Sequence, residues 1–193
     1  MSRTLRAKRT LSGLAAGAMT LGLLPAGVAS AGVAEVCENA PDDVFNDTSG
    51  TFFEDEINCI AGYEITLGVS EGVYAPQNPV QRGQMASFIT RMIENGSLED
   101  LEDGDSPFTD IAGTEHEDNI EKLFSAGVVE GRTATTYVPN MDVTRGQMAS
   151  FIARAMEEFG FDLPDDPDDA FNDDDGTAHE DRINQLAELG VVT

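Results

Sequence analysis

The chain repeats itself at a fixed interval of 63 residues, and this repeat limits its fold more than any other feature. The first half of the repeating unit occurs three times, and the second half occurs twice. The recurring anchors of the first half are Phe45, Phe108 and Phe171, then Asp47, Asp110 and Asp173, then Ile57, Ile120 and Ile183. Small units of this kind bury their apolar faces against their neighbours, so we expect an array of units.

The first half of each unit has the pattern of a short amphipathic helix. Thr51 stands three residues before Glu54, which is the spacing of a capping box, and the same pair recurs in the other two units. We therefore expect a helix to start at each of these threonines. Ile57, Ile60 and Ala61 then follow at positions i, i+3 and i+4, which gives this helix one inner apolar face.

The second half of the unit predicts a longer helix that begins at an Arg-Gly-Gln-Met block, at Arg82 and again at Arg145. Thr144 and Gln147 have the spacing of a further capping box. In the first copy Gln81 takes the place of that threonine, and we expect it to cap the helix less well.

The segments between the two helices of a unit carry glycine and proline signals. Residues 68–79 and 131–139 should form loops with at most a short strand. The predicted fold class is therefore mainly α, with tandem helix-loop-helix repeats of 63-residue period and an incomplete third repeat.

The first 31 residues are typical of a secretory signal peptide, with a basic start, an apolar run from Leu11 to Leu24 and an Ala-Ser-Ala cleavage signal. The apolar run is shorter than the roughly 20 residues that span a bilayer, so we expect no membrane insertion after cleavage. The further boundaries are 32–44 for an N-terminal segment with Cys37, 45–96 for repeat 1, 97–107 for an acidic linker, 108–159 for repeat 2, 160–170 for a second acidic linker, and 171–193 for a partial repeat 3.

The chain is strongly acidic, with 36 Asp and Glu against 11 Lys and Arg and a formal net charge of -25. Cleavage after Ala31 would leave seven cations and a formal charge of -29. Such a chain has no stripe of cations that could displace the counterions of a nucleic acid, so we exclude nucleic acid as a partner. Binding to anionic lipid head groups is excluded for the same reason.

Cys37 and Cys59 are the two cysteines of the chain, and both follow the predicted signal peptide. In an oxidising compartment such a pair is more typical of a disulfide than of two free thiols. A zinc site is not predicted, because one cysteine pair and two distant histidines do not supply four ligands at metal spacing.

No metal site or cofactor is predicted from the acidic segments. An EF-hand loop set on Gly176 would need an acidic first ligand where Phe171 stands, so that pattern fails. Weak calcium binding by scattered carboxylates is the alternative to the interpretation that we prefer, a solvated acidic surface.

At these repeats the chain resembles the S-layer homology family, and in particular a subgroup of acidic bacterial cell-surface proteins. Repeats of that family have an aromatic-x-Asp start, a helix, a Gly-hydrophobic turn, an aromatic-x-Pro loop, and a Thr-Arg block that opens a second helix. The resemblance covers 45–91, 108–154 and half of a third copy from Phe171. It differs at Gln81-Arg82-Gly83-Gln84, where the family usually has Thr-Arg-Ala-Glu, and the chain contains no tryptophan.

The resemblance implies three repeats packed around a pseudo-threefold centre and noncovalent attachment to cell-wall polysaccharide. The protein would then be secreted and held at the cell wall or cell surface. The alternatives are a protein-interaction or adhesin scaffold and the anchoring part of a longer exported enzyme. The half-length third copy implies either a fragment of a longer chain or self-association that completes the array.

Arg82 and Arg145 are the first candidates for ligand binding. Each falls at a helix start, where the positive end of the macrodipole disfavours a cation. Either an anionic sugar substituent docks on the guanidinium and the helix N–H groups, or each arginine bridges internally to a carboxylate such as Asp47 or Asp110.

Tyr74 and Tyr137, which stand before the loop prolines, are the aromatic candidates for the same site. They would either stack on the face of a sugar or pin the loop to the core. The complete set of candidate ligand-binding residues is Arg82, Arg145, Tyr74, Tyr137, Asp47 and Asp110.

No catalytic residue is predicted. His116 and His179 occupy equivalent positions where the first copy has Phe53, which favours a packed ring over a general base. Ser87 and Ser150 have no histidine beside them in the sequence, so no nucleophile arrangement is visible.

Overall fold

The computed structural model describes residues 37–38, 40–96 and 100–193. The predicted signal peptide and residues 32–36 and 39 of the N-terminal segment lie outside this part, so the signal peptide stays a prediction. The described helices are α2 (Glu54–Gly62), α3 (Arg82–Asn95), α4 (Glu117–Ser125), α5 (Arg145–Glu158) and α6 (Glu180–Glu188). The described chain has no strand and only two isolated β-bridges, Ser70 with Val73 and Gln81 with Asp142, which confirms the mainly α class and the prediction of loops with at most a short strand.

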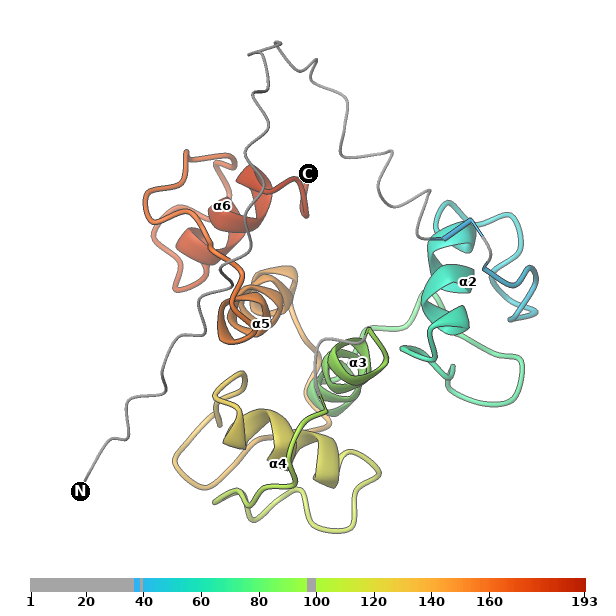
Figure 1. Cartoon of the computed structure of the whole chain (residues 1–193), viewed down its shortest axis with the longest axis horizontal. Helices are drawn as coiled ribbons and strands as arrows, with labels where there is room; N and C mark the ends of the chain where they lie inside the picture. The colour runs from blue at the N-terminus through green and yellow to red at the C-terminus, as the bar shows by residue number, and fades with distance from the viewer. Residues whose placement is uncertain (1–36, 39, 97–99) are drawn as a thin grey trace, which may run out of the picture.

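The two long helices α3 and α5 lie near the centre of the molecule, and the short helices α2, α4 and α6 lie around them (Figure 1). Helix α3 packs against α4, α5 packs against α6, and α3 also contacts α5. Each long helix is therefore in closest contact with the short helix of the next repeat. Among the described helices, none packs against α2.

The main core fills the space between α3, α4 and α5. Its largest fully buried side chains include Tyr137, Ile93, Ile111, Ile120, Leu123, Val128 and Val129. A smaller cluster of Ala149, Ala153 and Leu186 joins α5 to α6. Since each fully buried Leu or Ile stabilises by about 1.5–3 kcal/mol, the second repeat holds the best-packed part of the molecule.

The short helices begin three residues later than their threonines predict. Phe53, His116 and His179 are the N-caps, and none of them makes a side-chain cap hydrogen bond. The capping-box prediction at Thr51 is wrong, because the carboxylate of Glu54 accepts the N–H of Gly50 at 2.6 Å instead. Gly50 has a positive φ of 74°, and this turn delays the helix until Glu54.

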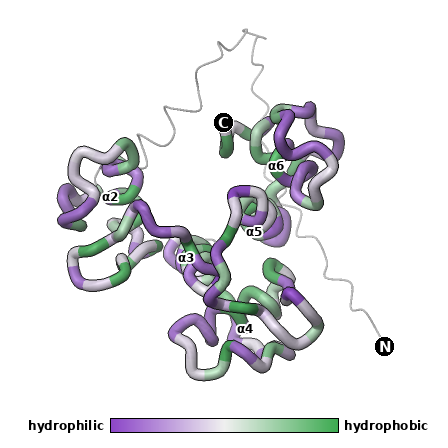
Figure 2. Tube along the Cα trace, turned by 180° about the vertical axis from the view of Figure 1, so that it is seen from behind, coloured by the Kyte–Doolittle hydropathy of each residue, from purple (hydrophilic) through white to green (hydrophobic). Residues whose placement is uncertain are grey.

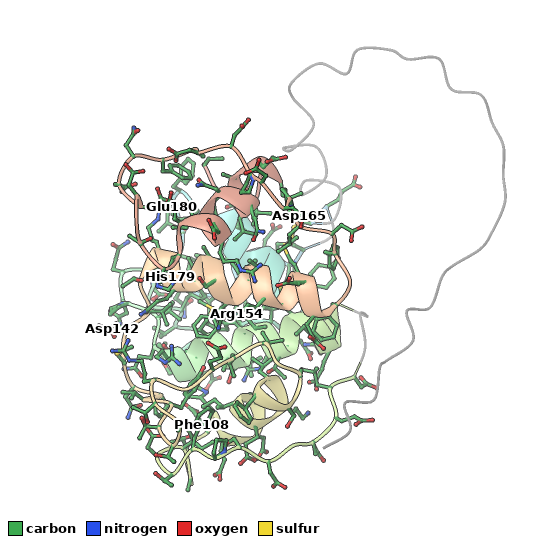
Figure 3. All side chains as sticks on the ribbon, turned by 90° about the vertical axis from the view of Figure 1, so that its left-hand side faces the viewer. Phe108, Asp142, Arg154, Asp165, His179 and Glu180 are labelled. Carbon is green, nitrogen blue, oxygen red and sulfur yellow. A yellow bond between two sulfur atoms is a disulfide. The ribbon has the colours of Figure 1, made fainter. Side chains whose placement is uncertain are left out.

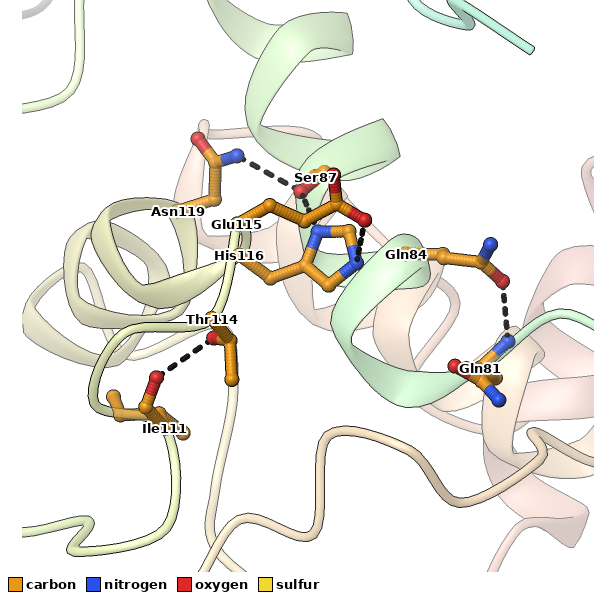
Figure 4. Close-up of polar contacts among 8 residues, drawn as sticks. All are labelled: Gln81, Gln84, Ser87, Ile111, Thr114, Glu115, His116 and Asn119. Carbon is orange, nitrogen blue, oxygen red and sulfur yellow. Dashed lines mark hydrogen bonds and ion pairs between the residues drawn. The ribbon is translucent and has the colours of Figure 1, made fainter. Parts of the chain in front are cut away.

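The long helices begin where the sequence predicts, at Arg82 and Arg145. The capping box at Thr144 is confirmed: Gln147 N–H donates to Thr144 Oγ1 at 3.2 Å, and Thr144 N–H donates to Gln147 Oε1 at 3.1 Å. In the first copy Gln84 Oε1 accepts the N–H of Gln81 at 2.9 Å (Figure 4).

The disulfide between Cys37 and Cys59 is confirmed, with a Cα–Cα distance of 5.2 Å. It ties the N-terminal segment to α2. None of the helices in the described ranges combines the length and the apolar character needed to cross a membrane.

Candidate functional site

The loop of each complete repeat is held by an aspartate from the start of that repeat. Asp110 accepts the N–H of Tyr137 at 2.9 Å and that of Val138 at 2.8 Å. Burial acts to raise the pKa of Asp110, but these backbone hydrogen bonds outweigh it and the pKa is lowered. Val138 has a φ of 60°, so the carboxylate holds the loop in a conformation that a β-branched residue rarely adopts.

Asp47 does the same for the first loop. It accepts the N–H of Tyr74 at 2.9 Å and that of Ala75 at 2.7 Å, and Ala75 also has a φ of 60°. The hydrogen bond from Tyr74 is the main reason that the pKa of Asp47 is lowered. Neither aspartate forms an ion pair with an arginine among the described residues. The predicted internal bridge from an arginine to Asp47 or Asp110 is therefore not present there, and Arg82 donates to backbone carbonyls instead.

Arg82 is buried in the loop of the second repeat. Its Nε donates to the carbonyl of Tyr137 at 2.9 Å, and its Nη2 donates to the carbonyl of Glu130 at 3.0 Å. The guanidinium carbon lies 4.4 Å from the centre of the Tyr137 ring, and Tyr137 Oη donates back to the Arg82 carbonyl at 3.2 Å. Burial lowers the pKa of Arg82, and the contacts join α3 to the next repeat.

The N-terminal N–H groups of α3 are also occupied. Arg82 N–H donates to the carbonyl of Met141 at 2.9 Å, and Gly83 N–H donates to that of Pro139 at 2.8 Å. Val143 N–H donates in turn to the Val80 carbonyl at 2.8 Å. An anion docked at the start of α3 would therefore find these donors already paired.

Arg145, the equivalent residue on α5, is exposed. It lines a cavity of about 510 Å³ together with Thr144, Gly146, Asp173 and Asp174. In the described part of the chain its guanidinium has no hydrogen-bond or ion-pair partner. Arg82 and Arg145 occupy the same repeat position, but Arg82 is buried and Arg145 is exposed.

A second cavity of about 480 Å³ lies between the first loop and α3. Its wall includes Tyr74, Gln84, Arg91, His116 and Asp142. Tyr74 is half-buried, with its ring centre 5.4 Å from that of Phe45, and burial raises its pKa. Tyr74 is the one sequence-predicted site residue in this cavity.

Arg91 is a charged residue of this cavity that the sequence analysis did not select as a site residue. Its repeat equivalent Arg154 pairs with Glu130 at 3.2 Å. Leu67 stands at the position of that glutamate in the first copy, so Arg91 has no such partner. The loss of the partner between copies was the sequence signal that could have found it.

The structure also brings together serine and histidine side chains that the sequence separates by 29 residues. Ser87 Oγ lies 2.9 Å from His116 Nδ1, and Asn119 Nδ2 donates to the same Ser87 Oγ at 2.8 Å (Figure 4). Ser150 and His179 repeat the contact at 2.9 Å, where α6 meets α5 (Figure 3). The recurrence of the same 29-residue separation in two copies was the signal for this pairing.

The serine-histidine pair of the first two repeats joins α3 to the start of α4, and both side chains also line the cavity between the first loop and α3. Ser87 is only 1% exposed, and a Cβ placed on Gly83 would lie 2.5 Å from His116 Cδ2. The imidazole therefore packs tightly on the start of α3, as the packed-ring interpretation predicts. Burial lowers the pKa of His116, although the nearby Glu115 opposes this effect.

Comparison with known proteins gives a consistent result. Residues 44–86 and 107–149 match the S-layer homology domain. The chain is 28% identical over 119 residues to the exoglucanase XynX of Acetivibrio thermocellus, covering 58% of this chain and 10% of that protein. It is 28% identical over 131 residues to a 125 kDa surface-layer protein of Lysinibacillus sphaericus, covering 67% of this chain and 10% of that protein.

An S-layer protein of Bacillus licheniformis is 26% identical over 195 residues, which covers 99% of this chain and 20% of that protein. An amylopullulanase of Thermoanaerobacterium thermosulfurigenes is 29% identical over 60% of this chain and 6% of the enzyme. The chain thus spans at most about a fifth of the length of these relatives.

Proposed function

Because residues 44–86 and 107–149 match the S-layer homology domain, we propose that the chain attaches an exported protein noncovalently to a cell-wall polysaccharide. S-layer homology domains anchor surface proteins, and they are not catalytic. The enzymes among the relatives are similar over a tenth of their length or less. A longer exported enzyme, with this segment as its anchoring part, is compatible with the same attachment function.

The observation that carries this proposal is the cavity between the first loop and α3. Its volume of about 480 Å³ falls in the range of small-molecule sites. Tyr74 offers an aromatic surface for a sugar ring, and Arg91 offers a cation that forms no ion pair with any described residue. Gln84 and Asp142 add a neutral and an acidic hydrogen-bonding group for sugar hydroxyls.

The six candidate residues divide into two groups in this proposal. Asp47, Asp110, Arg82 and Tyr137 hold the loops in place and act on the ligand only through that scaffold. Tyr74 contacts the sugar directly. Arg145 is a second ligand contact, in the cavity of about 510 Å³ between the start of α5 and the third repeat.

A pull-down by isolated cell walls tests the proposal, with and without prior extraction of the wall polysaccharide. Arg91→Gln removes the cavity cation and should lower wall affinity about 10-fold or more, since a hydrogen bond to a charged group contributes about 1.5–3 kcal/mol. Arg154→Gln is the matched control, because this residue has the same repeat position but is paired with Glu130.

Wall retention that survives polysaccharide extraction would contradict the proposal. So would equal losses for Arg91→Gln and Arg154→Gln, because only the first variant changes the cavity. Melting curves of both variants exclude unfolding as the cause.

The alternative function is a protein-interaction scaffold, and the apolar surface of the first repeat favours it. Phe52 is 87% exposed, Phe53 60%, Leu67 60% and Val69 53%. In the proposed pseudo-threefold array, a third long helix would pack against α2 as α3 packs against α4. A second copy of the chain could provide a long helix that buries this apolar surface on α2, and the protein would then self-associate.

Sedimentation analysis over a range of protein concentrations tests self-association. A mass that rises with concentration, and that Phe53→Asp returns to the monomer value, would support it. The protein could instead remain a monomer at all concentrations and fail to bind cell walls. Binding to a different protein would then be the better-supported function.

A further inference from the structure

The third repeat contains a buried carboxylate that has no hydrogen-bond partner among the residues that the structure describes. Asp174 is 6% exposed, and both of its carboxylate oxygens are buried without a hydrogen bond. A charge in this position is unfavourable unless a cation or several donors balance it. Arg145 lines the same cavity, but no ion pair joins it to Asp174 in the described chain.

Two further carboxylates lie beside Asp174. Ligand oxygens of Asp169, Asp174 and Asp175 all lie within 4.8 Å of one another. Two ligands on opposite sides of a calcium ion, each at about 2.4 Å, are about 4.8 Å apart, so the three oxygens can surround one ion. The loop before α6 that carries them is hydrophilic along most of its length (Figure 2).

The other repeats place no such cluster at these positions. The equivalents of Asp169, Asp174 and Asp175 are Asp43, Thr48 and Ser49 in the first copy and Ser106, Ile111 and Ala112 in the second. Thr48 and Ile111 are also buried, and Thr48 Oγ1 donates to the Phe45 carbonyl at 3.1 Å. The fold therefore accepts a neutral side chain here, and the carboxylate of Asp174 is specific to the third copy.

We infer that Asp169, Asp174 and Asp175 form a calcium-binding site at the base of the third repeat. The donors are all carboxylate oxygens, which suit a hard cation and not zinc. An irregular loop fits the flexible coordination of Ca²⁺ better than the strict octahedron of Mg²⁺, with water completing the shell. Sites in extracellular modules bind with Kd values of about 0.1–1 mM, and we expect this range.

The test uses the whole chain, freed of metal with a chelator and then titrated with CaCl₂. Amide chemical shifts followed by NMR should change at residues 169–176, and calorimetry should give a saturable isotherm. At 5 mM Ca²⁺ the Tm should rise by about 3–6 °C. NaCl of equal ionic strength and MgCl₂ of equal concentration separate this effect from general screening of the acidic surface.

Asp174→Ile copies the residue of the second repeat. It should abolish the calcium response and be at least as stable as the metal-free parent. Asp169→Asn and Asp175→Asn keep Asp174 in place and should each weaken calcium binding about 10-fold. Asp166→Asn, an exposed acid in the same linker but outside the cluster, is the matched control and should bind as the parent does.

Three results would overturn the inference. One is a calcium response spread over the whole acidic surface and equal in the parent and Asp174→Ile. Another is an equal response to Mg²⁺. The third is a parent that, without metal, is more stable than Asp174→Ile, since Asp174 would then have a favourable partner inside the protein.

Discussion

Helices α3 and α5 begin with the same eight residues, Arg-Gly-Gln-Met-Ala-Ser-Phe-Ile, yet their first turns have different surroundings. Arg82 and Met85 are buried at the start of α3. Their equivalents Arg145 and Met148 are exposed at the start of α5, Met148 by 38%. Local sequence therefore fixes where these helices start but not what their first turns contact.

The difference arises from the loop of the following repeat. Loop residues 130–141 fold over the start of α3 and supply four carbonyl acceptors to Arg82 and Gly83. No described residue supplies such acceptors to the start of α5. The same repeat position is therefore structural at Arg82, which the loop of the next repeat covers, and exposed at Arg145.

The largest expected effect comes from truncating the two arginines. Arg82→Ala leaves two buried carbonyls without their charged donor and should lower the free energy of unfolding by about 4 kcal/mol. Arg145→Ala changes an exposed side chain and should stay within about 0.5 kcal/mol of the parent. Urea unfolding measures both, and similar losses would mean that the two helix starts have similar surroundings in solution.

The short helices extend the comparison, because α4 is covered by α3 whereas α2 relies on the disulfide. Reducing Cys37–Cys59 opens a loop with a sequence separation of 22 and should cost roughly 3 kcal/mol on the chain-entropy model. Hydrogen exchange should increase in α2 and remain unchanged in α4. Equal loosening of both helices would show that the repeats unfold as one unit.

Acid should weaken the contact of α3 with α4 through His116. Its pKa in the folded protein is below the ordinary 6.5, so its contribution to stability is complete above pH 6.5 and is lost as the pH falls through the lowered value. Glu115 and Arg91 are the charged groups that act on this ring. The parent should therefore lose more stability than His116→Gln between pH 7.5 and 5.

Unfolding curves of the parent and His116→Gln at each pH give the difference between their free energies of unfolding. The many carboxylates titrate in both proteins, so their effect cancels in this difference. NMR titration of the imidazole provides a direct check. A His116 pKa at or above 6.5 would contradict the prediction.

The last expected effect concerns Tyr137, whose ring contacts the Arg82 guanidinium. Burial raises its pKa to about 12, against 10 for an ordinary tyrosine. Its contribution to stability is complete below pH 10 and is lost as the pH rises through 12. Ultraviolet titration should show one tyrosine ionising last, and Tyr137→Phe should remove that step while costing about 1 kcal/mol through the lost hydrogen bond to the Arg82 carbonyl.

The sequence by itself determined the mainly α class, the starts of the long helices and the cysteine pair, because these depend on local pattern, capping and composition. It also located Asp47 and Asp110, although not their role in holding positive-φ loop residues. The delayed starts of the short helices escaped it, because a glycine turn outweighs the threonine-glutamate spacing.

Only the tertiary structure decided which parts of one repeat are buried by the next repeat. Packing of a long helix against the short helix of the next repeat joins Ser87 to His116, and the loop of that repeat buries Arg82. These properties depend on contacts between copies. Two identical segments have identical local preferences, so a 63-residue repeat cannot reveal which of its copies will be covered.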